Sequence, residues 1–179
     1  RSLLRADEKT GAAMRWAHRV WVFLWLTVFG LGIGLLSLYL TANSYAGIDA
    51  QALWASYMKL PLLVVMNLLL PLLVVYLGFF LFARPWAAYL LSAVPFLTLA
   101  LANYYKIQLR GDPVLASDLR LLRTAGGIMG NYSFELSAPV GIVAAGFVTM
   151  LLLSILLLRR EHMSRHERLA GLMLLLSLT

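Results

Sequence analysis

The sequence predicts an all-α protein that crosses a lipid bilayer as a polytopic bundle of transmembrane helices. Of its 179 residues, 61% are hydrophobic and only 13% are charged, and the mean hydropathy is +0.82. A soluble domain is closer to half apolar and a quarter charged, so this chain could not cover its surface with polar groups in water. Four uncharged stretches are long enough to cross about 30 Å of hydrocarbon as helices, and none alternates with the period of two that barrel strands require. We therefore expect four full spans and a fifth that the end of the sequence cuts short.

The first span should cover about 20–42, behind a basic segment, 1–19, that we assign to the cytoplasm. Its apolar body, WVFLWLTVFGLGIGLLSLYL, is too long for a secretory signal and indicates a signal anchor. The remaining spans are expected at about 60–83, 85–105, 136–158 and, cut short, 169–179. The chain thus divides into the segment 1–19 and a transmembrane domain over 20–179.

Basic residues divide unevenly between the connecting segments, and this bias predicts the orientation. With a cytoplasmic N-terminus, ten basic residues lie inside and five outside, together the 15 of the chain. The inner residues are Arg1, Arg5, Lys9, Arg15, Arg19, Arg84, Arg159, Arg160, Arg165 and Arg168, and the outer ones are Lys59, Lys106, Arg110, Arg120 and Arg123. The segment 106–135 then becomes a loop at the outer interface. The net charge is +7, and the charged residues lie between the apolar runs. We therefore expect an anionic lipid surface as the partner, and no nucleic acid.

Polar and small residues inside the spans suggest how the helices pack. Gly30 and Gly34 have the GxxxG spacing that lets two helix backbones approach closely, and we favour packing within the chain over a dimer interface. Asn67 should form a hydrogen bond between helices, because a buried amide is costly unless paired. The spans carry no charge in their interiors, whereas pumps and ion-coupled transporters usually need one. His162 and His166 are four residues apart without a third ligand, so we expect no metal site.

The outer loop is the most informative stretch. Gly111, Asp112 and Pro113 predict a turn, and a short amphipathic helix is expected from Ser117 or Asp118 through Thr124. Its cations are Arg120 and Arg123, whose like charges repel at this spacing, and Lys106 and Arg110 add charge at the same depth. These side chains suit a phosphate-containing headgroup. The alternatives are contact with generic headgroups, or pairing with Asp112 and Asp118 to stabilise the loop.

The same region resembles a known family. Asn103-Tyr104-Tyr105-Lys106, Arg110-Gly111-Asp112-Pro113 and Ser117-Asp118-Leu119 form the pattern NYxK…RGxP…SDL directly after the third span. This pattern resembles the membrane domain of the lipoteichoic acid synthase family, the sulfatase-like phosphoglycerol transferases, and the rest of the chain agrees with that family in topology. The resemblance implies five spans followed by an extracellular catalytic domain, with a threonine nucleophile and a divalent metal, typically manganese. That domain lies outside this sequence, so we assign no catalytic residue and expect no activity from this chain alone.

We therefore expect the membrane domain of a phosphoglycerol transferase in a bacterial plasma membrane. It would anchor the enzyme and present phosphatidylglycerol to the catalytic domain. The candidates for contact with the lipid headgroup, or for docking of that domain, are Asn103, Lys106, Arg110, Asp112, Asp118, Arg120 and Arg123. The alternative functions are a non-enzymatic lipid transporter or flippase subunit, which needs a polar path across the bilayer, and a membrane scaffold.

Overall fold

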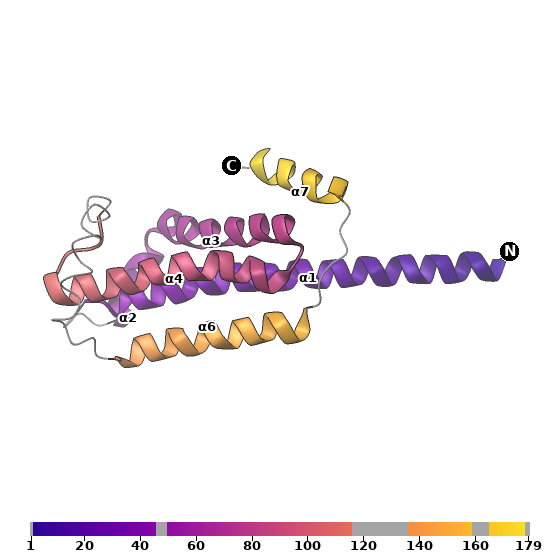
Figure 1. The fold of residues 1–179 in the computed structure, drawn as a ribbon. Coiled ribbons are helices and arrows are strands. Elements are labelled where there is room, and N and C mark those ends of the chain that lie inside the picture. Colours follow the sequence, from indigo (N-terminus) through magenta and orange to yellow (C-terminus); the bar gives the residue numbers. More distant parts are fainter. Residues whose placement is uncertain (1, 46–49, 116–135, 159–164, 178–179) are drawn as a thin grey trace.

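The computed structural model describes residues 2–45, 50–115, 136–158 and 165–177, and every regular element in these ranges is an α-helix. The helices are α1 (Ser2–Ala42), α2 (Ala50–Met58), α3 (Pro61–Phe82), α4 (Pro85–Arg110), α6 (Ala138–Leu157) and α7 (Arg165–Ser177). Within this part of the chain, four helices are long and apolar enough to cross a membrane: α1 from Trp16 onward, α3, α4 and α6. The predicted all-α fold with four full spans is confirmed. In Figure 1 the four spans form one bundle, and the N-terminal part of α1 projects beyond it.

Local sequence signals explain where the spans begin and end. Pro61 and Pro85 open α3 and α4 at the first helical position, where the missing N–H costs nothing. The helix α4 continues past residue 105 and ends at Gly111, whose φ of 76° is the left-handed conformation that glycine adopts without strain. The nine-residue helix α2 had not been predicted.

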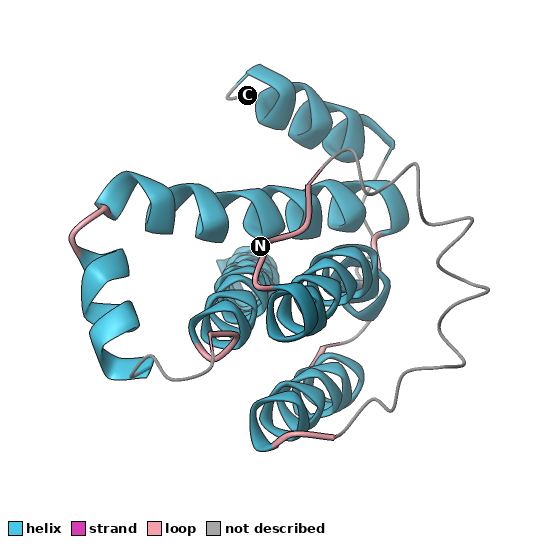
Figure 2. Ribbon diagram, turned by 90° about the vertical axis from the view of Figure 1, so that its left-hand side faces the viewer, coloured by secondary structure: helices cyan, strands magenta, loops and turns pink. Residues whose placement is uncertain are grey.

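We call the end of the bundle where α1 and α4 finish the distal end, and the end where α3 finishes and α4 starts the proximal end. Figure 2 views the bundle along its length, with α1, α4 and α6 nearly end-on and α3 crossing them obliquely. The buried residues of α3 lie between Pro71 and Phe79, from its middle onward. The first half of α3 leans away from α4 toward the distal end, while Leu68 stays close to Gly34 of α1.

The oblique crossing depends on small residues in α1. A Cβ atom added at Gly30 would lie 2.7 Å from Leu72 Cα, and one added at Gly34 would lie 3.0 Å from Leu68 Cα. Only glycine lets the two backbones come this close. The GxxxG spacing therefore serves packing within the chain, as expected.

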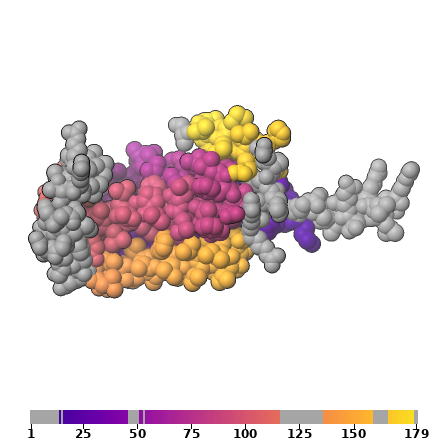
Figure 3. Space-filling view, viewed as in Figure 1, coloured from indigo at the N-terminus to yellow at the C-terminus, as the bar shows by residue number. Residues whose placement is uncertain are grey.

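Tyrosine hydroxyls connect neighbouring spans. Among the described residues, Tyr76 Oη lies 2.7 Å from Thr27 Oγ1 and donates to Phe23 O, Tyr89 donates to Phe147 O, and Tyr104 Oη lies 2.7 Å from Ser137 Oγ. These contacts join α1 to α3 and α4 to α6, and Figure 3 shows α4 between α3 and α6 on one face. The apolar rings fill the core while their polar ends find partners, as buried tyrosine requires.

The helix α7 is held at the proximal end by two arginines. Arg19 forms a 2.9 Å ion pair with Glu167, and Arg168 Nε donates to the carbonyl oxygen of Phe80 at 2.8 Å. That carbonyl belongs to the last turn of α3, where backbone oxygens lack helical partners. The start of α7 is thereby fixed to both α1 and α3.

Candidate functional site

Two of the predicted site residues shape the turn that follows α4. Asn103 Oδ1 accepts a hydrogen bond from the Val114 amide at 2.9 Å, and Lys106 Nζ donates to the Pro113 carbonyl at 2.8 Å. Asn103 and Lys106 lie one turn apart on the same face of α4, so they hold the segment after Gly111 against the helix. Of the roles considered for them, these contacts support loop architecture directly.

The other predicted residues fall into two groups. Arg110 is the last residue of α4 and is exposed, at a helix C-terminus where positive charge is favourable. Asp112 is exposed in the turn. Asp118, Arg120 and Arg123, with the expected amphipathic helix, lie outside the described residues. The structure thus brings together Asn103, Lys106, Arg110 and Asp112 at the distal end.

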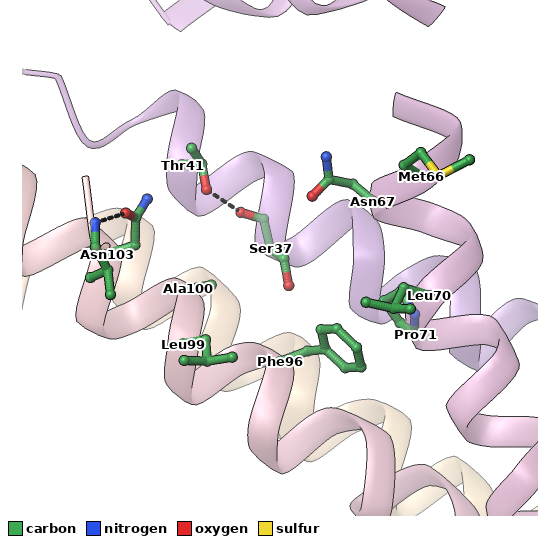
Figure 4. Close-up of a pocket in the computed structure, with 11 residues that line it drawn as sticks. Ser37, Thr41, Met66, Asn67, Leu70, Pro71, Phe96, Leu99, Ala100 and Asn103 are labelled. Carbon is green, nitrogen blue, oxygen red and sulfur yellow. Dashed lines mark hydrogen bonds between the residues drawn. The ribbon is translucent and has the colours of Figure 1, made fainter. Parts of the chain in front are cut away.

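A cavity of about 480 Å³ opens beside this turn, between α1, α3 and α4. It is lined by Ser37, Thr41, Met66, Asn67, Leu70, Pro71, Phe96, Leu99, Ala100, Asn103 and Val114, and Figure 4 shows the side chains around it. The cavity exists because the first half of α3 leans away from α4. Its volume lies in the range of sites that bind small molecules.

Three polar side chains on α1 and α3 line the cavity, and each donates to a carbonyl one turn earlier in its own helix. Ser37 Oγ donates to Ile33 O at 2.9 Å, Thr41 Oγ1 to Ser37 O at 2.9 Å and Asn67 Nδ2 to Leu63 O at 2.8 Å. The predicted hydrogen bond from Asn67 to another helix is therefore wrong. The side chain of Asn67 is exposed, and the nearest acceptor is the backbone of α3 itself. Its Oδ1 points toward the cavity in Figure 4.

Pro71 explains the backbone around Asn67. Proline has no N–H, so the Asn67 carbonyl loses the donor that an unbroken helix would supply four residues later. That carbonyl lies against Gly34, where an added Cβ would be 3.0 Å away. This part of α3 is tied to α4, because the buried Ser92 Oγ donates to the Pro71 carbonyl at 2.9 Å.

Sequence reasoning missed the contribution of α1 to this cavity. Gly30, Gly34, Ser37 and Thr41 follow one another at intervals of four, three and four residues, so they share one face of the helix. This face carries glycine where α3 crosses it, at Gly30 and Gly34. It carries the hydroxyl groups of Ser37 and Thr41 beside the cavity. Following the same helix face, at steps of three and four residues, toward the end of the span would have pointed to Ser37 and Thr41.

A second cavity, of about 400 Å³, lies between the end of α1 and α2. Its walls are mostly apolar and include Tyr39 and Trp54, with Asn43 and Gln51 among the remaining residues. None of its described lining residues is a predicted site residue. The α1–α3–α4 cavity is therefore the one associated with the predicted site.

The α1–α3–α4 cavity is suited to binding a neutral polar group. None of the described residues that line it is ionisable, and the cations Lys106 and Arg110 lie on the same face of α4 as Asn103, farther toward the distal end. A neutral polar group would fit inside, with a negative charge outside near the cations. No protein-family model, curated protein or solved structure matches the chain.

Proposed function

We propose that this chain is the membrane domain of a lipoteichoic acid synthase-like phosphoglycerol transferase, which anchors the enzyme and presents phosphatidylglycerol at the outer leaflet. In this proposal the protein lies in a bacterial plasma membrane with its N-terminus in the cytoplasm and the distal end outside. The observation that carries it is the position of Asn103. This residue belongs to the NYxK…RGxP pattern, fixes the turn that leads to the outer loop, and also lines the cavity.

The chemistry of the donor lipid fits the distal end. Phosphatidylglycerol has an anionic phosphate and an uncharged glycerol headgroup. Arg110 and Lys106 supply positive charge at the end of α4, where each cation near a lipid surface contributes about 1 kcal/mol to the binding of anionic lipid. The neutral polar cavity beside them offers room for the uncharged part. Holding donor lipid here would place it where a catalytic domain attached after α7 could reach it.

Transfer itself belongs to a domain beyond this sequence, to which the family resemblance assigns the threonine nucleophile and a divalent metal such as manganese. The proposal therefore predicts that the gene continues in frame, after the codon for Thr179, with several hundred residues of a sulfatase-like domain. It also predicts that a cysteine introduced at Arg110 reacts with an impermeant maleimide added outside intact cells. Labelling of this cysteine only after the cells are opened would contradict the orientation.

Lipid binding by the chain itself tests the central claim. The purified chain in nanodiscs of phosphatidylcholine with added phosphatidylglycerol should retain phosphatidylglycerol preferentially in native mass spectrometry. Arg110→Gln should weaken this retention about fivefold, whereas Arg84→Gln, which removes an exposed cation at the proximal end, away from the cavity, should weaken it less. Equal binding of the two lipids, or equal effects of the two substitutions, would refute the proposal. Rapid lipid scrambling by the reconstituted chain would instead favour a flippase.

A further inference from the structure

We infer that the α1–α3–α4 cavity recognises the uncharged diol of a lipid headgroup through hydrogen bonds, with Asn67 as the central contact. The inference rests on the proposed function for the identity of the lipid, phosphatidylglycerol. It goes further by assigning selectivity to hydroxyl groups inside the bundle, separately from the attraction between the outer cations and the phosphate.

The hydrogen bonds already present determine which donor and acceptor atoms of the cavity remain available to a ligand. Ser37 and Thr41 use their only protons on backbone carbonyls, so their oxygens remain as acceptors. Asn67 uses one N–H on Leu63 O, which leaves Oδ1 as an acceptor and a second N–H as a donor. Asn103 Oδ1 accepts from Val114, so the Asn103 amide group remains a donor.

This set of groups matches a neutral hydroxylated ligand. Each hydroxyl of a diol both donates and accepts, and the cavity supplies acceptors on α1 and α3 and donors on α3 and α4. The phosphate is a poorer match for the interior, because none of the described residues that line the cavity is a cation and burying an unpaired charge is costly.

The cavity can be reached from the side of the bundle. Met66, Leu70 and Leu99 line it and are also 53%, 56% and 53% exposed, on the surface that lipid would cover. The acyl chains of a bound lipid can therefore follow these apolar side chains while its headgroup enters between α3 and α4. A lipid-borne diol suits this lateral entrance better than free glycerol, which would arrive from water.

A matched pair of lipids isolates the hydroxyl groups. Phosphatidylglycerol and phosphatidylpropanol can carry the same acyl chains and the same phosphate charge, and phosphatidylpropanol lacks both headgroup hydroxyls. The purified chain in phosphatidylcholine nanodiscs with equal amounts of the two should retain phosphatidylglycerol about tenfold more strongly, as two hydrogen bonds would give. Equal retention of both, each above phosphatidylcholine, would overturn this inference and leave the proposed function intact. Retention of neither would overturn both.

Asn67→Leu should abolish the preference between the two lipids. The substitution places an apolar side chain at an exposed position of a lipid-facing helix, so the fold should tolerate it. Asn43→Leu is the matched control, because Asn43 makes the same type of hydrogen bond, to Tyr39 O, but lines the other cavity. Thr41→Val keeps the side-chain shape and should reduce the preference in part.

The outcomes decide the inference in both directions. A preference for phosphatidylglycerol that survives both Asn67→Leu and Thr41→Val would refute the inference. So would a control variant, Asn43→Leu, that loses as much of the preference as Asn67→Leu does. Free glycerol added in a separate series identifies the source of the diol. At a glycerol concentration no higher than that of the lipid, loss of the preference would show that glycerol itself occupies the cavity and would refute the lipid-borne diol, and persistence would support it. Competition only at a large molar excess of glycerol also supports it, because free glycerol carries the same hydroxyl groups.

Discussion

Replacing Gly30 with alanine should force α1 and α3 apart. The new Cβ would lie 2.7 Å from both Cα and Cδ1 of Leu72, whereas carbon atoms in comfortable contact are about 3.5–4.0 Å apart. Because one of the opposing atoms belongs to the backbone, a change of rotamer cannot relieve the clash, and the helices must separate by roughly 1 Å. Such overpacking costs about 1–3 kcal/mol. The better helix propensity of alanine returns about 1 kcal/mol, so we expect a net loss of about 1 kcal/mol in the free energy of unfolding.

Gly141→Ala is the matched control for this prediction. Gly141 lies in α6, and a Cβ added there meets no heavy atom within 4 Å, so only the gain of about 1 kcal/mol from helix propensity remains. Reversible unfolding in mixed micelles with increasing sodium dodecyl sulfate, followed by circular dichroism, gives the free energy for each variant. The difference between the two variants measures the clash, and we expect about 1–3 kcal/mol. Equal stability of the two would refute the close approach of α1 and α3.

Three further substitutions test other contacts of the fold and the site. Tyr76→Phe removes the hydrogen bonds from α3 to α1 and should lower the free energy of unfolding in the same assay by about 1 kcal/mol; an unchanged value would contradict the bond. Asn103→Leu removes the acceptor of the Val114 amide and should speed hydrogen exchange at that amide about fivefold, while unchanged exchange would show that the turn does not depend on it. Arg168→Gln should loosen α7 from α3 and broaden the distances between spin labels placed on the two helices, which the absence of native cysteine makes straightforward. A distribution as narrow as in the parent would exclude an anchoring role for Arg168.

The spans were predictable because lipid imposes a simple rule on sequence. A helix that crosses hydrocarbon needs about 20 apolar residues, and charge-free runs of that length are rare by chance. Proline marks the start of α3 and α4 equally clearly. The end of α4 was placed too early because charge-free length measures the hydrocarbon, whereas the helix itself continues until Gly111 can stop it.

The site was only partly predictable. The motif residues Asn103 and Lys106 were identified from sequence, but their partners, Val114 and Pro113, depend on how the chain folds back after α4. The cavity depends on the tilt of α3, which follows from its packing on Gly30 and Gly34 of α1. Such tertiary geometry leaves no local signal.

The failed prediction at Asn67 has a physical reason of the same kind. A side-chain amide in a helix competes for the carbonyl one turn earlier, which is always within reach. An acceptor on another helix becomes available only if packing brings it there. At Asn67 the side chain is exposed and α3 leans away from α4, so the local acceptor is the one that is used.

The length of α1 links two distant parts of the molecule. Its 41 residues form a rod of about 60 Å, roughly twice the thickness of the hydrocarbon layer. The same rod carries Arg19, which pairs with Glu167 of α7 toward the proximal end, and Ser37 and Thr41, which line the α1–α3–α4 cavity toward the distal end. Because an α-helix resists bending and stretching, a force or torque on the projecting end of α1 would be transmitted along the helix to Ser37 and Thr41 in the cavity wall.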